Sequence, residues 1–140
     1  MQQDQLDLLS AALRHQEDAE HLLASSKDQS WHLAGFATEC VRKAVLTNDQ
    51  LRKSLAHEQG MHFDALFEIV VSLDPRALQL RVSGWADSPT QLSMWSESHR
   101  YDPTGRHVGK AAALVGETGT HFDRTLTQLW LTEGFNPGAL

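Results

Sequence analysis

The stretch Ser30–Leu46, SWHLAGFATECVRKAVL, predicts the helix around which the rest of the chain folds. At helical spacing, Leu33, Ala37, Cys40 and Ala44 fall on one face, and polar or charged side chains fill most of the remaining circumference. Small residues leave room for a neighbouring element to approach closely. They recur along this stretch as Ala34, Gly35, Ala37 and Ala44. The pattern indicates a central core helix.

Apolar residues at helical spacing predict further helices on both sides of the central one. The expected ranges are about 4–24, 62–74, 75–84 and 108–129, with a shorter helical stretch after Ser88. Asp28 or Ser30 is expected to cap the central helix, and the tail from about residue 134 is expected to fray. No segment alternates as a strand does. The sequence therefore predicts one all-α domain over residues 1–140, an up-and-down bundle of four to five main helices.

The composition is typical of a soluble globular domain. The chain has 140 residues, of which 41% are hydrophobic, and no apolar run approaches the roughly 18 residues that cross a membrane. Its start, MQQDQLDLLS, does not resemble a signal peptide, so we expect a cytoplasmic protein that does not engage a membrane. The lone cysteine, Cys40, cannot form an internal disulfide and is expected to be a packed thiol.

Charge and motifs exclude several function classes. A net charge of −6 argues against broad coating of nucleic acid, although a local basic cleft stays compatible with it. The sequence contains no glycine-rich phosphate loop, no HExxH and no CxxC. The eight histidines are scattered, so we predict neither a metal site nor another cofactor.

One polar cluster precedes the last predicted helix, and it consists of Glu97, His99, Arg100, Tyr101, Asp102, Arg106 and His107. Its positive charges, together with the N-terminus of that helix, suit a phosphate. A histidine can transfer a proton near neutral pH, and a neighbouring arginine can stabilise a pentacoordinate phosphorane without a metal. In the alternative, purely structural interpretation, Arg100 pairs with an acidic neighbour, Tyr101 packs into the bundle and His107 is an exposed first-turn residue.

The chain resembles the HEPN family over about a third of its length. The matching pieces are Ala34–Cys40 followed by Lys43 and Ala44, then His62 ahead of Phe63, Leu66 and Phe67, then Trp95 leading to Arg100 and Tyr101. HEPN domains are small helical bundles that commonly dimerise. Many belong to prokaryotic toxin–antitoxin and defence systems, often beside a minimal nucleotidyltransferase. The resemblance implies a homodimer and a partner protein of the nucleotidyltransferase type.

The resemblance also implies candidate site residues. Catalytic HEPN members are metal-independent endoribonucleases with a closely spaced arginine and histidine, and Arg100 and His107, with six residues between them, lie at the upper limit of that spacing. Pro103 and Gly105 interrupt this interval, and the Arg100–Tyr101 pair is more similar to members regarded as non-catalytic. In such a member Glu39 and Lys43 would be structural or groove-lining, and His62 would cap or pack its helix. The candidate ligand-binding residues are His99, Arg100, Tyr101, Arg106 and Lys110.

Three functional hypotheses follow. The first is a non-catalytic, dimerising HEPN-like module that binds a nucleotide, RNA or a partner protein. The second is a metal-independent endoribonuclease that uses Arg100 and His107, so the sequence leaves open whether the protein is an enzyme. The third is a helical scaffolding or interaction domain with an accidental resemblance. Tryptophans at positions 31, 85, 95 and 130 are many for one small core, and a two-fold interface could bury one or two of them.

Overall fold

The computed structural model describes residues 1–46, 48, 52–53, 61–73, 75 and 91–140. The α-helices are α1 (Gln3–Leu22), α2 (Lys27–Ala44), α4 (Met61–Leu73) and α5 (Ala111–Glu133). Short 3-10 helices in the described ranges are η2 (Leu92–Met94), η3 (Glu97–Tyr101) and η4 (Pro137–Ala139). These described ranges contain no strand, which confirms the predicted all-α class.

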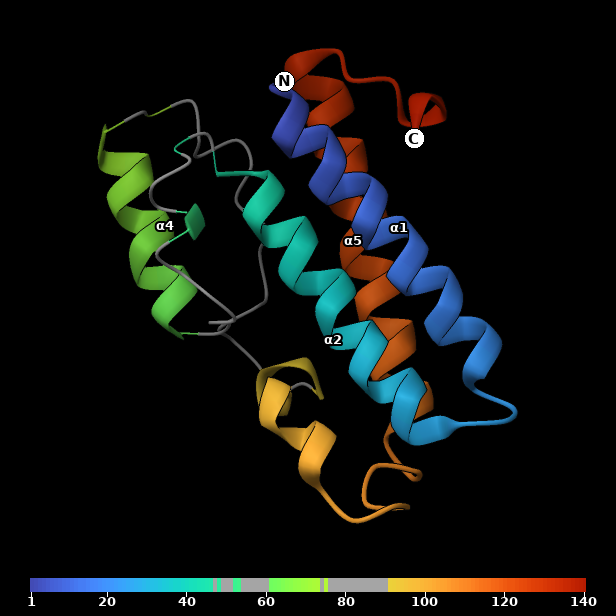
Figure 1. The fold of residues 1–140 in the computed structure, drawn as a ribbon. Coiled ribbons are helices and arrows are strands. Elements are labelled where there is room, and N and C mark those ends of the chain that lie inside the picture. The colour runs from blue at the N-terminus through green and yellow to red at the C-terminus, as the bar shows by residue number, and fades with distance from the viewer. Residues whose placement is uncertain (47, 49–51, 54–60, 74, 76–90) are drawn as a thin grey trace.

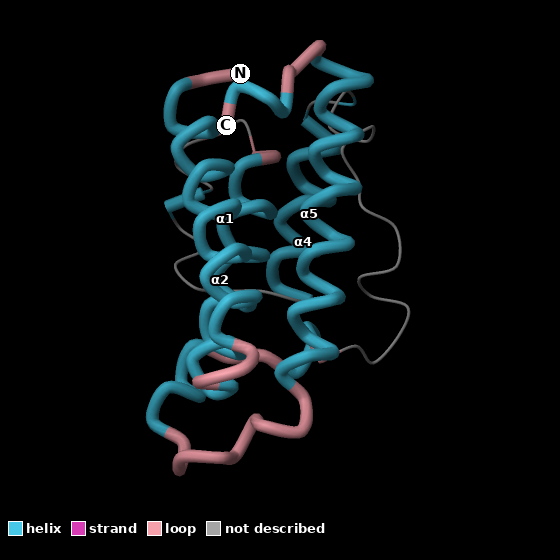
Figure 2. Tube along the Cα trace, turned by 90° about the vertical axis from the view of Figure 1, so that its right-hand side faces the viewer, coloured by secondary structure: helices cyan, strands magenta, loops and turns pink. Residues whose placement is uncertain are grey.

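Helices α1, α2 and α5 pack side by side, and α2 contacts both of the others (Figure 1). Both chain termini lie at one end of this bundle, whereas the loop between η3 and α5 lies at the opposite end (Figure 2). None of the helices in the described ranges is both long enough and apolar enough to cross a membrane. The predicted helix over residues 75–84 and the predicted helix start at Ser88 lie outside the described residues.

The central position of α2 is confirmed by its burial, because eleven of its residues are buried. The indole of Trp95 lies so close to Gly35 that a Cβ at this position would overlap it. The absence of a side chain at Gly35 therefore allows Trp95 to approach α2 closely, as predicted for the small residues of this helix. The expected single apolar face is wrong in detail: Leu33 and Cys40 are only half-buried, whereas polar side chains outside that face are buried, namely His32, Thr38, Glu39 and Arg42. A helix with neighbours on several sides buries more than one face.

The start of α2 also differs from the prediction. The helix begins at Lys27 after the cap residue Ser26, whose side chain makes no capping hydrogen bond. Ser30 lies inside the first turns, and its hydroxyl donates to the backbone oxygen of Ala19 at 2.6 Å. Asp28 accepts hydrogen bonds from a distant loop, described below. Both expected caps are thus engaged in tertiary contacts.

The last helix begins later than expected, and the tail packs more tightly than expected. Helix α5 begins at Ala111, three residues later than predicted, and ends at Gly134 with φ 67°, a left-handed conformation that glycine adopts readily. The tail does not fray: Phe135 and Leu140 pack against the core on either side of η4. Close packing at a glycine of α5 is found at Gly119, where a Cβ would lie 3.1 Å from the amide nitrogen of Gln16.

The buried core has a different character at the two ends of α2. The aliphatic end consists of Leu9, Ala44, Val45, Leu46, Val70 and Leu129. Around the start of α2, the buried apolar residues include Trp31, Trp95, Leu114 and Val115. Val70 comes from α4, in agreement with the predicted apolar stripe of that helix; the side chains of Phe63, Leu66 and Phe67 lie outside the described part.

Candidate functional site

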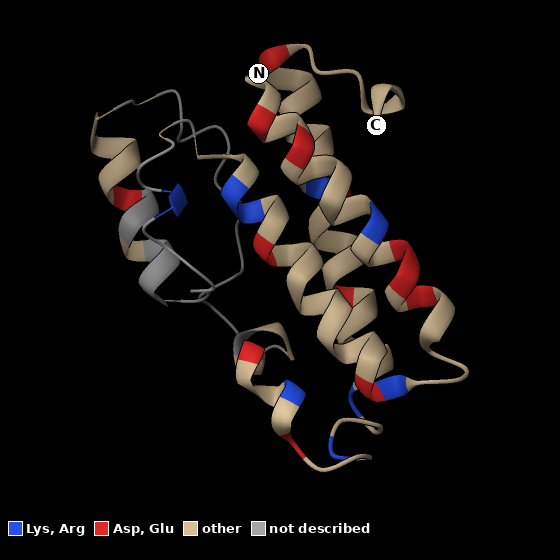
Figure 3. Cartoon of the chain, viewed as in Figure 1, with Lys and Arg blue, Asp and Glu red and all other residues tan. Residues whose placement is uncertain are grey.

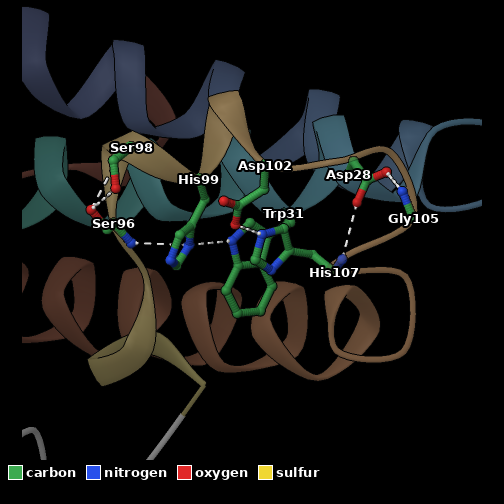
Figure 4. Close-up of polar contacts among 8 residues, drawn as sticks. All are labelled: Asp28, Trp31, Ser96, Ser98, His99, Asp102, Gly105 and His107. Carbon is green, nitrogen blue, oxygen red and sulfur yellow. Dashed lines mark hydrogen bonds and ion pairs between the residues drawn. The ribbon is translucent and has the colours of Figure 1, made fainter.

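Three rings from distant parts of the chain meet at the start of α2 (Figure 4). Trp31 comes from α2, His99 from η3, and His107 from the loop before α5. The ring centroids of Trp31 and His107 are 4.7 Å apart at an interplanar angle of 12°, and those of His99 and His107 are 4.6 Å apart. We call these three residues the ring cluster. It fastens η3 and the following loop to α2.

The hydrogen bonds of His99 define which ring nitrogen carries the proton. Its Nδ1 accepts from the indole Nε1 of Trp31 at 3.1 Å and from the backbone nitrogen of Ser96 at 3.3 Å. Both partners are N–H groups that can only donate, so Nδ1 must present its lone pair. We therefore assign the proton of the neutral ring to Nε2.

His107 is buried, with only 6% of its surface exposed, so the expectation of an exposed first-turn residue is wrong. Its Nε2 lies 2.8 Å from Oδ2 of Asp102 and donates to this carboxylate. The ring thus has a carboxylate on one side and the Trp31 and His99 rings around it. The hydrogen bond to the Asp102 carboxylate orients the imidazole of His107. Because this ring is buried, access to it is restricted.

Asp28 ties the loop to the first turn of α2. Its two carboxylate oxygens accept from the backbone nitrogens of Gly105 at 2.6 Å and of His107 at 3.1 Å. The hydrogen bond from Gly105 is the main cause that lowers the pKa of Asp28. The carboxylate is therefore held in its charged form, which is the form that accepts both bonds.

Burial lowers the pKa of two histidines at this end of the bundle. For His99, the loss of solvation is the largest cause, and the charge of His107 lowers the pKa further. His32 on α2 has a lowered pKa for the same two reasons, and a hydrogen bond to the backbone of His99 acts in the opposite direction. The surroundings thus favour neutral rings at both positions.

The basic candidates lie on the outside of the ring cluster. Arg100, Arg106 and Lys110 are exposed, and Figure 3 shows basic segments on η3 and on the loop before α5, with acidic segments between them. Tyr101 is 77% exposed and does not pack into the bundle as the structural interpretation expected. The guanidinium carbon of Arg100 lies 4.9 Å from the centre of the Tyr101 ring, so this arginine stacks on its neighbour where an acidic partner was expected.

The structure thus brings together some predicted site residues and separates others. His99 and His107 share the ring cluster, whereas Arg100 stacks on Tyr101 outside it. The sequence analysis did not include Trp31 or Asp28 in the site. Both lie near the start of the central helix, and their partners are 68 and 77 to 79 positions away in the chain.

His99, Asp102 and His107 place ligand-type atoms within 4.8 Å of one another. A metal ion requires an imidazole nitrogen with an available lone pair. In His99, Nδ1 accepts two hydrogen bonds and Nε2 carries the proton, and Nε2 of His107 donates to Asp102. In the described structure the three residues form a hydrogen-bonded cluster, in which Nε2 of His107 and Oδ2 of Asp102 already bind each other.

The remaining polar candidates belong to α2. Nζ of Lys43 lies 2.6 Å from the carboxylate of Glu39, and Glu39 is buried, so this ion pair is largely enclosed. Burial raises the pKa of the Cys40 thiol to about 11, which agrees with an unreactive packed cysteine. The side chain of His62 lies outside the described part.

Comparisons of the chain with protein-family models, with curated proteins and with solved structures find no match. The resemblance to HEPN domains therefore stays a prediction.

Proposed function

We propose that the protein is a dimerising helical module, similar to HEPN domains, that binds the phosphates of a nucleotide or RNA without cleaving them. One observation carries this proposal: the ring of His107 is buried and hydrogen-bonded, while the basic side chains beside it are exposed. Binding requires accessible cations. Metal-independent cleavage requires in addition an imidazole that reaches the reacting phosphate.

The proposed binding surface consists of Arg100, Tyr101, Arg106 and Lys110, which are all exposed. The three cations supply charge for phosphates, and the exposed Tyr101 ring supplies a face on which a base can stack. The whole chain is acidic, with a net charge of −6, so attraction should be confined to this surface and should weaken with salt. His99 would support the surface from beneath.

Binding can be tested by fluorescence anisotropy with a labelled single-stranded RNA and a fluorescent ATP analogue. In the triple variant R100Q/R106Q/K110Q we expect at least about tenfold weaker binding and a smaller salt dependence, because each lost phosphate contact removes one released counterion. Arg124→Gln is the matched control, because Arg124 is also exposed but lies within α5. Equal affinities of the triple variant and the control would contradict the proposal.

The second candidate is a metal-independent ribonuclease, because Asp102 orients His107 through the 2.8 Å hydrogen bond. The test is cleavage of a mixed RNA pool in EDTA by the wild type and by Arg100→Ala. Arg100 is exposed, so its removal should leave the fold intact, whereas removal of the buried His107 disturbs the ring cluster. We expect no cleavage; cleavage that Arg100→Ala abolishes would replace the proposal with the ribonuclease.

Dimerisation is supported by the exposed end of α5, where Trp130 is 58% and Leu131 is 69% exposed. Large apolar side chains at this exposure suit an interface. We expect light scattering to give twice the chain mass of 15.6 kDa, and Trp130→Ser to shift the protein toward the monomer. A wild-type monomer at micromolar concentration and above would contradict this part of the proposal.

A further inference from the structure

His99 occupies a position in which protonation breaks contacts. Its Nδ1 accepts from Trp31 at 3.1 Å and from Ser96 at 3.3 Å, and these bonds tie η3 to α2 and close the first turn of η3. A proton on Nδ1 would face two N–H donors, which have no lone pair to offer. An imidazolium at this place therefore loses both hydrogen bonds at once.

We propose that His99 is a pH-sensitive latch, and that protonation of its ring releases η3 from the start of α2. The latch acts through the fold and is independent of the ligand proposed above.

The charged groups around His99 disfavour a second proton on its ring more than they favour it. Near His99 and its neighbour His32 are the charged or titratable groups of α2, of the loop and of the start of α5: Asp28, Asp102, Arg106, His107 and Lys110. Asp102 is the carboxylate that favours a charged His99, but its Oδ2 already accepts from His107. Asp28 is likewise engaged, by two backbone nitrogens. The attraction from Asp102 is outweighed, because burial and the charges of His107, Lys110 and Arg106 all lower the pKa of His99.

The stacked pair of histidines adds a further constraint. The ring of His107 can become charged without losing its contact, because Nε2 donates to Asp102 in both protonation states. A charged His107 only 4.6 Å from the His99 ring centre then disfavours a charge on His99. The repulsion from His107 and the two lost hydrogen bonds thus both disfavour a charge on His99.

The released part is bounded on both sides. The Glu117 carboxylate on α5 accepts from the backbone nitrogens of Gln91 at 3.2 Å and of Leu92 at 3.0 Å, which holds η2 independently of His99. On the other side, α5 begins at Ala111, which is fully buried. Before that helix, Asp28 holds the backbone nitrogens of Gly105 and His107 through bonds that a proton on His99 does not remove. Opening is thus expected between about residues 96 and 104, and it would expose the ring of Trp31.

The sign of the pH dependence follows from the lowered pKa of His99. A ring that titrates lower in the folded than in the unfolded state stabilises the closed form above about 6.5, the ordinary histidine value, and this contribution is lost as the pH falls below it. His15, His32 and His121 also have lowered pKa values, because burial disfavours their charged forms. The pH dependence of the overall free energy of unfolding therefore has contributions from several histidines. A test of the latch needs a signal from the contacts of His99 itself.

The experiment follows the indole N–H signal of Trp31 by NMR in the full-length ¹⁵N-labelled protein from about pH 8 to about pH 5. Trp31→Phe assigns the signal. We expect a shifted or lost signal with a midpoint below about 6.5 in the wild type. In His99→Asn we expect no such transition, because Asn Oδ1 can stand in place of Nδ1 and accept the same two bonds without titrating. His21→Asn is the control, since His21 is an exposed histidine on α1. In this variant the Trp31 signal should change with pH as it does in the wild type.

An unchanged Trp31 signal down to about pH 5, or the same transition in His99→Asn and the wild type, would overturn the latch. If His99→Asn does not fold, long-range ¹H–¹⁵N correlations of the wild-type histidine rings decide. The latch requires an unprotonated Nδ1 on His99 at about pH 8 and its protonation together with the change at Trp31. A protonated Nδ1 at about pH 8 would overturn it.

Discussion

The two ends of α2 are attached by different kinds of contact. At the C-terminal end, Ala44 and the residues after it pack with Leu9 and Leu129 in the aliphatic end, which contains no histidine. At the N-terminal end, Trp31 contacts two histidines through ring stacking and a hydrogen bond. Aliphatic packing does not respond to pH, whereas the ring cluster depends on an unprotonated nitrogen. One helix thus has a permanent attachment and a conditional one.

The largest expected effect comes from breaking the aliphatic end. Leu129 is fully buried, so Leu129→Ala should lower the free energy of unfolding by about 2–5 kcal/mol through lost burial and a residual cavity. Urea unfolding at about pH 7.5 and about pH 5.5 should give the same loss, because no titratable group is removed. A loss that differs strongly between the two pH values would show that the two ends are not independent.

An intermediate effect is expected where α2 meets Trp95. In Gly35→Ala the new methyl group would overlap the indole, and displacement of this buried ring should cost about 1–3 kcal/mol. Gly116→Ala on α5 is the matched control. A Cβ there meets open space, so this substitution should stabilise the protein by up to about 1 kcal/mol. Equal effects of the two substitutions, measured by urea unfolding, would argue against the tight contact at Gly35.

The smallest effect is expected at Asp28. Asp28→Asn keeps one oxygen acceptor but loses the charge and the second acceptor, so the bonds to Gly105 and His107 should weaken by about 1 kcal/mol in total. The lowered pKa of Asp28 means that its contribution is present above the ordinary value near 3.9 and is lost as the pH falls below it. The difference between variant and wild type should therefore stay constant between about pH 7.5 and about pH 5.5 and shrink near pH 3.

If the difference in unfolding free energy between Asp28→Asn and the wild type changed near about pH 6, the pH response attributed to His99 would arise from the Asp28 contacts instead. This prediction separates the two titrating components of the N-terminal end, since the carboxylate and the imidazole act in different pH ranges.

Periodicity was enough to predict the helices and the central position of α2. The spacing of apolar residues locates α1, α2, α4 and α5 to within a few residues, because apolar side chains recur at helical spacing along each of them. The frayed tail was wrong because Phe135 and Leu140 find apolar partners that are distant in sequence. Local patterns do not contain that information.

The site was only partly predictable for the same reason. The polar residues between Glu97 and His107 stand out in the sequence, and three of them, His99, Asp102 and His107, meet at the ring cluster (Figure 4). Asp28 has the residue type and position of a helix cap, and its actual partners lie 77 and 79 residues away. The succession of Trp31 and His32 at the start of a core helix was the available signal, because both side chains have N–H groups that need partners when buried.

The most direct test of the comparison is hydrogen exchange measured separately at the two ends of α2. Protection factors, corrected for intrinsic rates, should fall between about pH 7.5 and about pH 5.5 for the Ser96 amide and the Trp31 indole, which donate to His99. Amides of Val41 to Ala44, next to the aliphatic end, should keep their protection. A parallel loss at both ends, or no loss at either, would contradict the account that protonation of His99 releases contacts at the N-terminal end of α2 alone.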